Sequence, residues 1–171
     1  MTGPQTPVPA PDLASAAAMW SAYVAAHPEH EGDLPPVEAF GDSAELAEEL
    51  LALVLQGTKR ATAGMVADYE REHEPLPTAG VHWVVTDGTG AARAVLRSRQ
   101  VRVGRLDSVD DAFAHDEGEG DRSRDWWLDA HLRFVGRRSA ALEVQDEGPA
   151  TQMVFERFTV AWPPEVADAA G

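Results

Sequence analysis

The sequence has no cysteine, almost no lysine and no long apolar run. Without cysteine, disulfide bonds, thiolate catalysis and cysteine-ligated zinc are excluded, so a metal would need histidine or carboxylate ligands. No apolar segment approaches the roughly 20 residues that a membrane helix needs. The first residues, MTGPQTPVPAPD, lack the basic start and apolar segment of an export signal. We therefore expect a cytoplasmic protein without a membrane partner.

The composition is sufficient for one globular domain. Of the 171 residues, 44% are hydrophobic and five are tryptophan, which provides enough apolar surface for a core. Both ends lack an apolar period, and the first is rich in proline. We predict a disordered tail over residues 1–12, a single domain over residues 13–162 and a flexible tail over residues 163–171.

The charge is strongly acidic but unevenly distributed. A net charge of -15 disfavours sequence-blind binding to long nucleic acids, because basic side chains must displace the counterions of the phosphates. We expect no DNA partner and find a small ligand easier to reconcile with this charge. Residues 93–105 nevertheless contain five arginines and no acid. That strip is either a solvated strand face paired with nearby carboxylates or a contact surface for phosphates.

Helix and strand patterns are mixed along the chain. Apolar spacing predicts helices over residues 14–28, 42–57 and 121–136, a short helix or turn over residues 65–75 and a short helix over residues 108–117. Asp42, Ser108 and Asp121 are the expected N-caps. Strands are predicted over residues 81–87, 91–104, 139–145 and 151–162, with a bulge in the hairpin formed by the first two. Because there is no regular strand-helix-strand alternation, we predict an α+β fold with a largely antiparallel sheet that curls into a small barrel.

Lys59, in the segment GTKRATAG, is the only lysine, so the other 13 of the 14 basic residues are arginines. A lysine amine can lose its proton in a dry site and act as a base, whereas a guanidinium stays charged. Thr62 follows three residues later, a spacing that brings the two side chains together on a helix-like turn. A neutral lysine could then activate the threonine hydroxyl. The alternative is a surface lysine followed by a threonine that caps the next helix.

The segment DEGEGD, residues 116–121, contains alternating acids and glycines. The glycines let the backbone turn, so that Glu117, Glu119 and Asp121 can converge. One carboxylate could orient the lysine and transfer a proton, or several could bind magnesium or manganese. Alternatively, Asp121 caps the following helix while the glutamates face water.

Three large side chains could either pack in the hydrophobic core or belong to a ligand-binding site. His131 lies on the apolar face of a predicted helix, and Trp83 and Trp127 could stack on a nucleobase or pack in the core. The sequence has no phosphate-cradling glycine motif and no G-x-S-x-G elbow. Phosphoryl transfer from a nucleoside triphosphate is therefore disfavoured.

Taken together, these segments resemble the ASCH domain family, relatives of the PUA domains. The matching stretches, between residues 40 and 161, are LVLQGTKRATAG, PLPTAG with VHWVV and DGTG, FAHDEGEGDRS, WWLDAHLRF and VFERF. The resemblance is to the larger type that contains EGEGD. It implies a small PUA-like β-barrel of mostly antiparallel strands surrounded by helices, with a cleft beside the G-x-K segment.

The resemblance also implies a choice of activities. Some members resemble amidohydrolases that deacylate N4-acylated cytidine without a cofactor, and their catalytic roles fall here on Lys59, Thr62 and Glu117. Others look like metal-dependent ribonucleases, whose divalent cation would bind to Glu117, Glu119 and Asp121, and many are presumed to bind RNA without catalysis. The expected partner is a modified nucleoside or RNA. The predicted substrate-binding residues are Arg60, Ala61, Gly64, Trp83, Trp127 and His131. Gly64 and its neighbours lack an arginine that amidohydrolases often have soon after the threonine.

Overall fold

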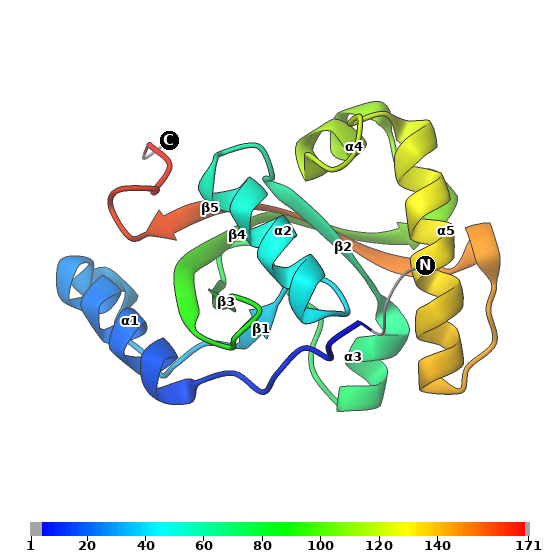
Figure 1. Cartoon of the computed structure of the whole chain (residues 1–171). Helices are drawn as coiled ribbons and strands as arrows, with labels where there is room; N and C mark the ends of the chain where they lie inside the picture. Colours follow the sequence, from blue (N-terminus) through cyan, green and yellow to red (C-terminus); the bar gives the residue numbers. More distant parts are fainter. Residues whose placement is uncertain (1–4, 170–171) are drawn as a thin grey trace. The chain divides into compact units, whose positions relative to one another are not determined.

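The computed structural model describes residues 5–169 and confirms the predicted α+β class (Figure 1). The chain divides into two compact units, each assembled from segments that are distant in sequence. The first unit comprises residues 1–57, 80–97 and 159–171, and the second comprises residues 58–79 and 98–158. Two long strands, β4 (Ala92–Arg105) and β5 (Gln152–Trp162), contribute residues to both units. The single domain over residues 13–162 stays a prediction.

The first unit packs two helices and a short sheet. Its strand order is β1-β3-β4, with β1 parallel to β3 and β3 antiparallel to β4. The register of β3 and β4 shifts between Val85 and Thr86, which confirms the predicted bulge. The elements confined to this unit are α1 (Leu13–Ala26), a 3-10 turn η1 (Pro28–His30), β1 (Val37–Ala39), α2 (Ala44–Leu55) and β3 (His82–Thr86). One part of its core consists of Ala16, Trp20, Tyr23, Val84 and Val95.

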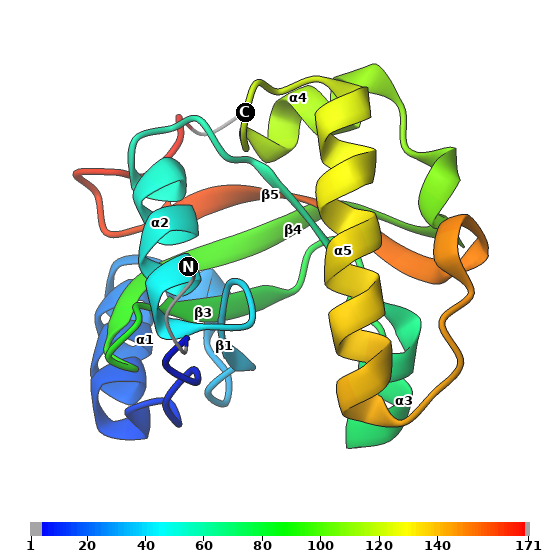
Figure 2. The same cartoon turned by 45° about the vertical axis from the view of Figure 1, so that its right-hand side comes forward.

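The second unit places its longest helix against the strands. Its strand order is β4-β5-β2, and β2 is antiparallel to β5. Figure 2 shows α5 lying across β2 and β5, with α4 near the start of α5. The elements confined to this unit are β2 (Ala61–Met65), α3 (Val66–Glu72), 3-10 turns η2 (Leu106–Ser108) and η3 (Gly148–Ala150), α4 (Asp111–Glu117) and α5 (Arg124–Leu142). Its core lies between the strands and the helices and includes Ala61, Met65, Phe113, Trp127, Val135, Leu142, Met153 and Phe155.

Helix α5 is longer than the sequence predicted. The helix was expected to end at Gly136, and residues 139–145 were expected to form a strand, but the helix continues to Leu142. The strand prediction is therefore wrong. Glycine inside a helix costs only about 1 kcal/mol relative to alanine. The burial of Val135, Ser139 and Leu142 along one face provides the packing that offsets this cost, and Glu143 ends the helix in the left-handed conformation.

The predicted N-caps are displaced by one or two residues. Ser43 instead of Asp42 accepts a hydrogen bond from the Leu46 N–H, at 3.1 Å, and caps α2. Asp110 instead of Ser108 caps α4. Ser123 instead of Asp121 caps α5, while Asp121 Oδ1 accepts from the Ser123 N–H at 2.8 Å. These segments offer several adjacent polar residues, so backbone geometry decides which one becomes the cap.

Residues at both predicted tails form hydrogen bonds within the first unit. The Thr6 hydroxyl donates to Glu45 at 2.8 Å, and the Asp12 N–H donates to the Gly90 carbonyl at 2.8 Å. Near the other end, the Asp168 N–H donates to the Val160 carbonyl at 2.9 Å. Residues 1–4 and 170–171 of the predicted tails lie outside the described residues. Among the helices described, none combines the length and apolar character that crossing a membrane would require.

Candidate functional site

The backbone around Lys59 is extended and enters β2. The Arg60 N–H donates to the Asp116 carbonyl at 2.7 Å, and the Arg60 carbonyl accepts from the Phe158 N–H at 3.0 Å. The second bond continues the antiparallel ladder of β2 and β5 by one residue. Side chains alternate between the faces of extended backbone, so Lys59 shares a face with Ala61, which lies in the core of the second unit. The Lys59 side chain is only 1% exposed.

Two glutamates surround the buried ammonium group. Lys59 Nζ lies 2.7 Å from Glu119 Oε1 and 3.7 Å from Glu117 Oε2. Glu117 is the last residue of α4, and Gly118 follows it with a left-handed φ of 72°. A Cβ atom at Gly118 would lie 2.6 Å from the Thr58 carbonyl oxygen, so glycine alone allows this close approach of the two segments. The approach brings both glutamates to Lys59.

Helix α5 adds an imidazole to this group. His131 Nε2 lies 3.6 Å from Glu117 Oε2, and its Nδ1 lies 3.0 Å from the Trp127 carbonyl oxygen. A carbonyl can only accept, so Nδ1 carries the proton and Nε2 of the neutral ring faces Glu117 with its lone pair. The Trp127 ring stacks on the imidazole with centroids 3.7 Å apart and fixes its orientation. We call Lys59, Glu117, Glu119 and His131 the lysine cluster.

Burial and charge give the members of the lysine cluster different protonation states. Burial raises the pKa of Glu117 to about 8, although the Lys59 charge acts in the opposite direction. Burial also opposes ionisation of Glu119, but the Lys59 charge outweighs it and lowers the pKa of this carboxyl. Burial lowers the pKa of His131 to about 4. At neutral pH the cluster therefore holds one anion, Glu119, beside a neutral Glu117 and a neutral His131.

Lys59 itself is the cation of the cluster. Burial alone would lower the pKa of its amine, but the charge interactions and hydrogen bonds with Glu117 and Glu119 together outweigh burial and raise it. This direction is opposite to the one that a neutral Lys59 would require, and the catalytic role of Lys59 stays a prediction. The charges of Lys59 and Glu119 compensate each other, which leaves Glu117 as the member of the cluster whose proton can move near neutral pH.

Thr62 lies in β2, directly opposite Glu156 of β5. The helix-like turn predicted from Lys59 to Thr62 is wrong, because the chain is extended from Arg60 onward. Alternation places Thr62 on the face opposite to that of Lys59 and Ala61. Its cross-strand neighbour Glu156 is buried and accepts a hydrogen bond from Ser98. The catalytic role predicted for Thr62 stays a prediction.

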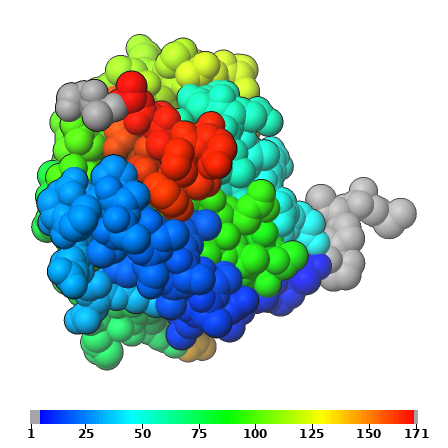
Figure 3. Space-filling view, turned by 90° about the vertical axis from the view of Figure 1, so that its left-hand side faces the viewer, coloured from blue at the N-terminus to red at the C-terminus, as the bar shows by residue number. Residues whose placement is uncertain are grey.

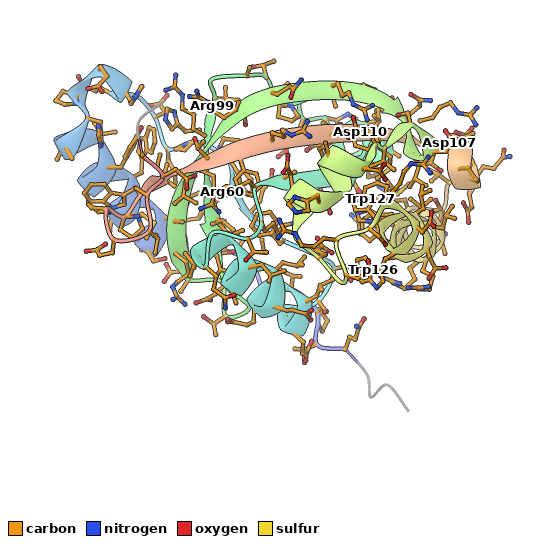
Figure 4. All side chains as sticks on the ribbon, turned by 90° about the horizontal axis from the view of Figure 1, so that it is seen from above. Arg60, Arg99, Asp107, Asp110, Trp126 and Trp127 are labelled. Atoms are coloured by element: carbon orange, nitrogen blue, oxygen red, sulfur yellow. The ribbon has the colours of Figure 1, made fainter. Side chains whose placement is uncertain are left out.

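Five of the six predicted substrate-binding residues lie in the second unit, and Trp83 lies in the first. Arg60 Nη1 donates to the Lys59 carbonyl at 2.8 Å, and Gly64 pairs with Val154 in the sheet. Trp127 lies beside Trp126 at the start of α5, but its ring is buried in the core (Figure 4). The remaining three lie as follows: Ala61 in the core, His131 in the lysine cluster, and Trp83 in β3 of the first unit with its ring edge-on to Phe40.

The metal ligands of the ribonuclease alternative, Glu117, Glu119 and Asp121, have other partners in the described part of the chain. Within residues 5–169, no three histidine or carboxylate side chains are arranged to hold a metal ion. Asp121 is engaged with the Ser123 N–H, and the Lys59 ammonium already provides the positive charge between Glu117 and Glu119. The alternating EGEG pattern did signal that two glutamates converge, but it did not show that Glu119 is the closer partner of Lys59.

Comparison with known proteins identifies the family. A model of the ASCH domain matches residues 37–161, which is most of the chain. The crystal structure of a protein from Enterococcus faecalis V583, assigned to the family model DUF984, is 31% identical, with a TM-score of 0.79 over 86% of this chain and 88% of that one. An ASCH domain from Lactobacillus crispatus JV V101 is 25% identical, with a TM-score of 0.78 over 88% of this chain and 96% of that one. No curated protein matches the chain significantly. The chain therefore belongs to the ASCH domain family, which has a PUA-like fold and is generally associated with RNA.

Proposed function

We propose that this ASCH domain is an amidohydrolase that removes the acyl group from N4-acylated cytidine, either as a nucleoside or within RNA. The substrate class comes from the family resemblance. The observation that carries the chemistry is the buried Glu117 carboxyl, whose pKa of about 8 lies close to neutral pH, where proton transfer is most effective. Both of its oxygens are buried without a hydrogen-bond partner in the described part of the chain. Such a group can accept a proton from a reactant.

The reaction assigns different roles to the two charged partners. Ionised Glu117 takes a proton from a water molecule, and the water oxygen attacks the carbonyl carbon of the amide. The Lys59 ammonium stabilises the negative charge that develops on the carbonyl oxygen. When the C–N bond breaks, Glu117 returns the proton to the departing cytosine amine, so that a carboxylic acid and cytidine are released. In this scheme Lys59 acts as a cation and not as a base.

The other members of the lysine cluster support these two groups. Glu119 accepts a hydrogen bond from Lys59 at 2.7 Å and keeps its amine charged even when Glu117 is neutral. His131 faces the Glu117 carboxyl and is itself held by the stack with Trp127. Glu119 is 17% exposed, against 1% for Lys59 and for Glu117, so substrate would approach from the side of Glu119. That approach requires the loop after α4 to move.

The decisive experiment measures hydrolysis of N4-acetylcytidine as a function of pH. For the wild type we expect kcat/KM to rise with pH and to level off near the Glu117 pKa of about 8. Glu117→Gln should lower kcat by about 10²- to 10⁴-fold, the usual contribution of a general base. Glu49→Gln, at an exposed position of α2, is the matched control and should leave the rate unchanged. Full activity in Glu117→Gln would refute the proposal.

The variant Thr62→Ala distinguishes this water mechanism from a mechanism in which the threonine is the nucleophile. Because Thr62 lies on the opposite face of β2 from Lys59, the water mechanism predicts that Thr62→Ala keeps its activity within a few-fold. A loss as large as that of Glu117→Gln would assign the attack to the threonine instead. The same assay with a chelator tests the ribonuclease alternative, for which short RNA would be cleaved only with a divalent cation. A domain that only binds RNA would show no turnover, and its affinity would fall with salt.

A further inference from the structure

We propose that the first unit contains a binding site for the phosphate group of a nucleotide, formed by Arg97 together with His27, His30 and His82. We call these four residues the histidine–arginine cluster. They come from β4, η1 and its N-cap, and β3, and all of them lie in the first unit. The lysine cluster lies in the second unit, so this inference does not depend on the proposed hydrolysis.

Arg97 is a cation without an ionic partner in the part of the chain that the structure describes. Its cross-strand neighbour in the antiparallel pair of β3 and β4 is His82. Arg97 shares a face of β4 with Val95, which packs against Trp20 and Tyr23 of α1. Among the described residues, no carboxylate forms an ion pair with Arg97, and its buried Nε has no hydrogen-bond acceptor. In a chain with a net charge of -15, such a guanidinium requires an explanation.

The three histidines contact Tyr23, two of them through its ring and one through its hydroxyl. The Tyr23 hydroxyl and His82 Nε2 are hydrogen-bonded at 2.9 Å. The His30 ring lies 4.7 Å from the His82 ring and stacks on Tyr23 at 5.7 Å, and His27 lies 6.4 Å from His30, all between centroids. The side chains of His27 and His30 are 41% and 24% exposed, so a ligand from solvent can reach them. Each neutral imidazole carries one N–H that can donate to an anion.

The local electrostatics favour a bound anion. Burial, followed by the positive influence of His30, Arg97 and His27, lowers the pKa of His82 to about 4. Two of the histidines pair with Glu29, whose Oε1 lies 3.7 Å from His27 and 3.9 Å from His30. It is 64% exposed, so water screens much of its charge.

The surroundings favour phosphate on a nucleotide. A guanidinium fork matches two phosphate oxygens, and the resulting charge-assisted hydrogen bonds are stronger than neutral ones. Trp20, Tyr23 and Trp162 flank the cluster, with Tyr23 and Trp162 centroids 6.3 Å apart. Figure 3 shows α1 and the segment after it, in blue, beside the C-terminal segment, in red, on one face. Trp162, which is partly exposed, would lie next to the sugar or base of a ligand held by its phosphate.

The test titrates the full chain with cytidine monophosphate, cytidine and inorganic phosphate while the histidine ring signals are followed by NMR. We expect cytidine monophosphate and inorganic phosphate to shift the signals of His27, His30 and His82, and cytidine alone to leave them in place. Tighter binding of the nucleotide than of inorganic phosphate would show that the aromatic rings contribute. Shifts with inorganic phosphate alone would restrict the site to free phosphate and overturn the assignment to a nucleotide.

Arg97→Gln is the variant that decides the role of the guanidinium. Charge-assisted hydrogen bonds are worth enough that its loss should weaken phosphate binding by at least about tenfold. Arg93→Gln is the matched control on the same strand, because Arg93 is exposed and pairs with Asp87 at 3.2 Å. It should bind phosphate like the wild type. Should Arg97→Gln fail to fold, Arg97→Lys keeps the charge but loses the fork, and it should bind more weakly than the wild type. Equal affinity in the wild type and the folded Arg97 variant would overturn the proposal.

Discussion

Glu117→Gln should change the pH dependence of stability in a defined window. In the unfolded chain the carboxyl has its ordinary pKa of 4.5, and in the folded protein burial raises that pKa to about 8. Between these two values the folded state binds a proton that the unfolded state has lost. The free energy of unfolding therefore falls as pH rises through the window, by about 1.4 kcal/mol per pH unit. The full difference, from 4.5 to about 8, amounts to about 5 kcal/mol.

His131 acts in the opposite direction over part of this window. Its ordinary pKa of 6.5 falls to about 4 on burial, so its contribution to stability is lost as pH falls from 6.5 toward 4. The two slopes cancel between pH 4.5 and 6.5. The decline due to Glu117 should therefore be visible in the wild type mainly between pH 6.5 and about 8.

Chemical denaturation of the wild type and Glu117→Gln at a series of pH values measures this effect directly. Glutamine resembles the neutral carboxyl in shape and does not titrate, so subtracting the two curves isolates the proton of Glu117. We expect the wild type to lose stability relative to the variant by about 1.4 kcal/mol per pH unit across the window. Glu49→Gln, exposed on α2, should run parallel to the wild type. Parallel curves for the wild type and Glu117→Gln would show that Glu117 is not buried as a neutral acid.

Three further substitutions test the packing around the lysine cluster, each by chemical denaturation. Lys59→Met leaves Glu119 buried without its cation and should cost about 3–5 kcal/mol, so an unchanged midpoint would contradict the ion pair. Gly118→Ala forces a Cβ atom against the Thr58 carbonyl at a left-handed φ and should cost about 1–3 kcal/mol. Asp110→Ala removes the N-cap bond to the Phe113 N–H and should cost about 1 kcal/mol, whereas Ser108→Ala, at the cap position expected from the sequence, should cost less.

The sequence predicted the elements that have a strong apolar periodicity and clear turn residues at their ends. The helix ending near Gly57 and the hairpin of β3 and β4 with its bulge follow from local patterns of apolar residues and turns. The end of α5 could not be predicted in this way. Gly136 is a local stop signal, but it is overridden by the burial of Val135 and Leu142 against segments distant in sequence. Local propensity gave the wrong answer where long-range packing decided.

The same distinction between local sequence patterns and long-range packing applies to the site. The sequence indicated that Lys59 and the EGEG loop belong together, and this was correct because the family resemblance joined segments about 60 residues apart. The protonation states were not accessible, because they depend on how many carboxylates reach the amine and how deeply all of them are buried. One glutamate at 2.7 Å and another at 3.7 Å are enough to reverse the expected direction of the Lys59 pKa. Spacing in the chain contains no such information.

The charge balance of the cluster also explains why lysine suits this position. An ammonium group is compact and can donate in several directions from one nitrogen, so it can serve Glu119 directly while remaining close to Glu117. A guanidinium is a broad planar fork that would tend to engage one carboxylate with two bonds. Gly118 passes so close to Thr58 that the segment has no space for a larger group without backbone movement. A cation that holds one glutamate ionised and leaves the other neutral is therefore best provided by the single lysine of the chain.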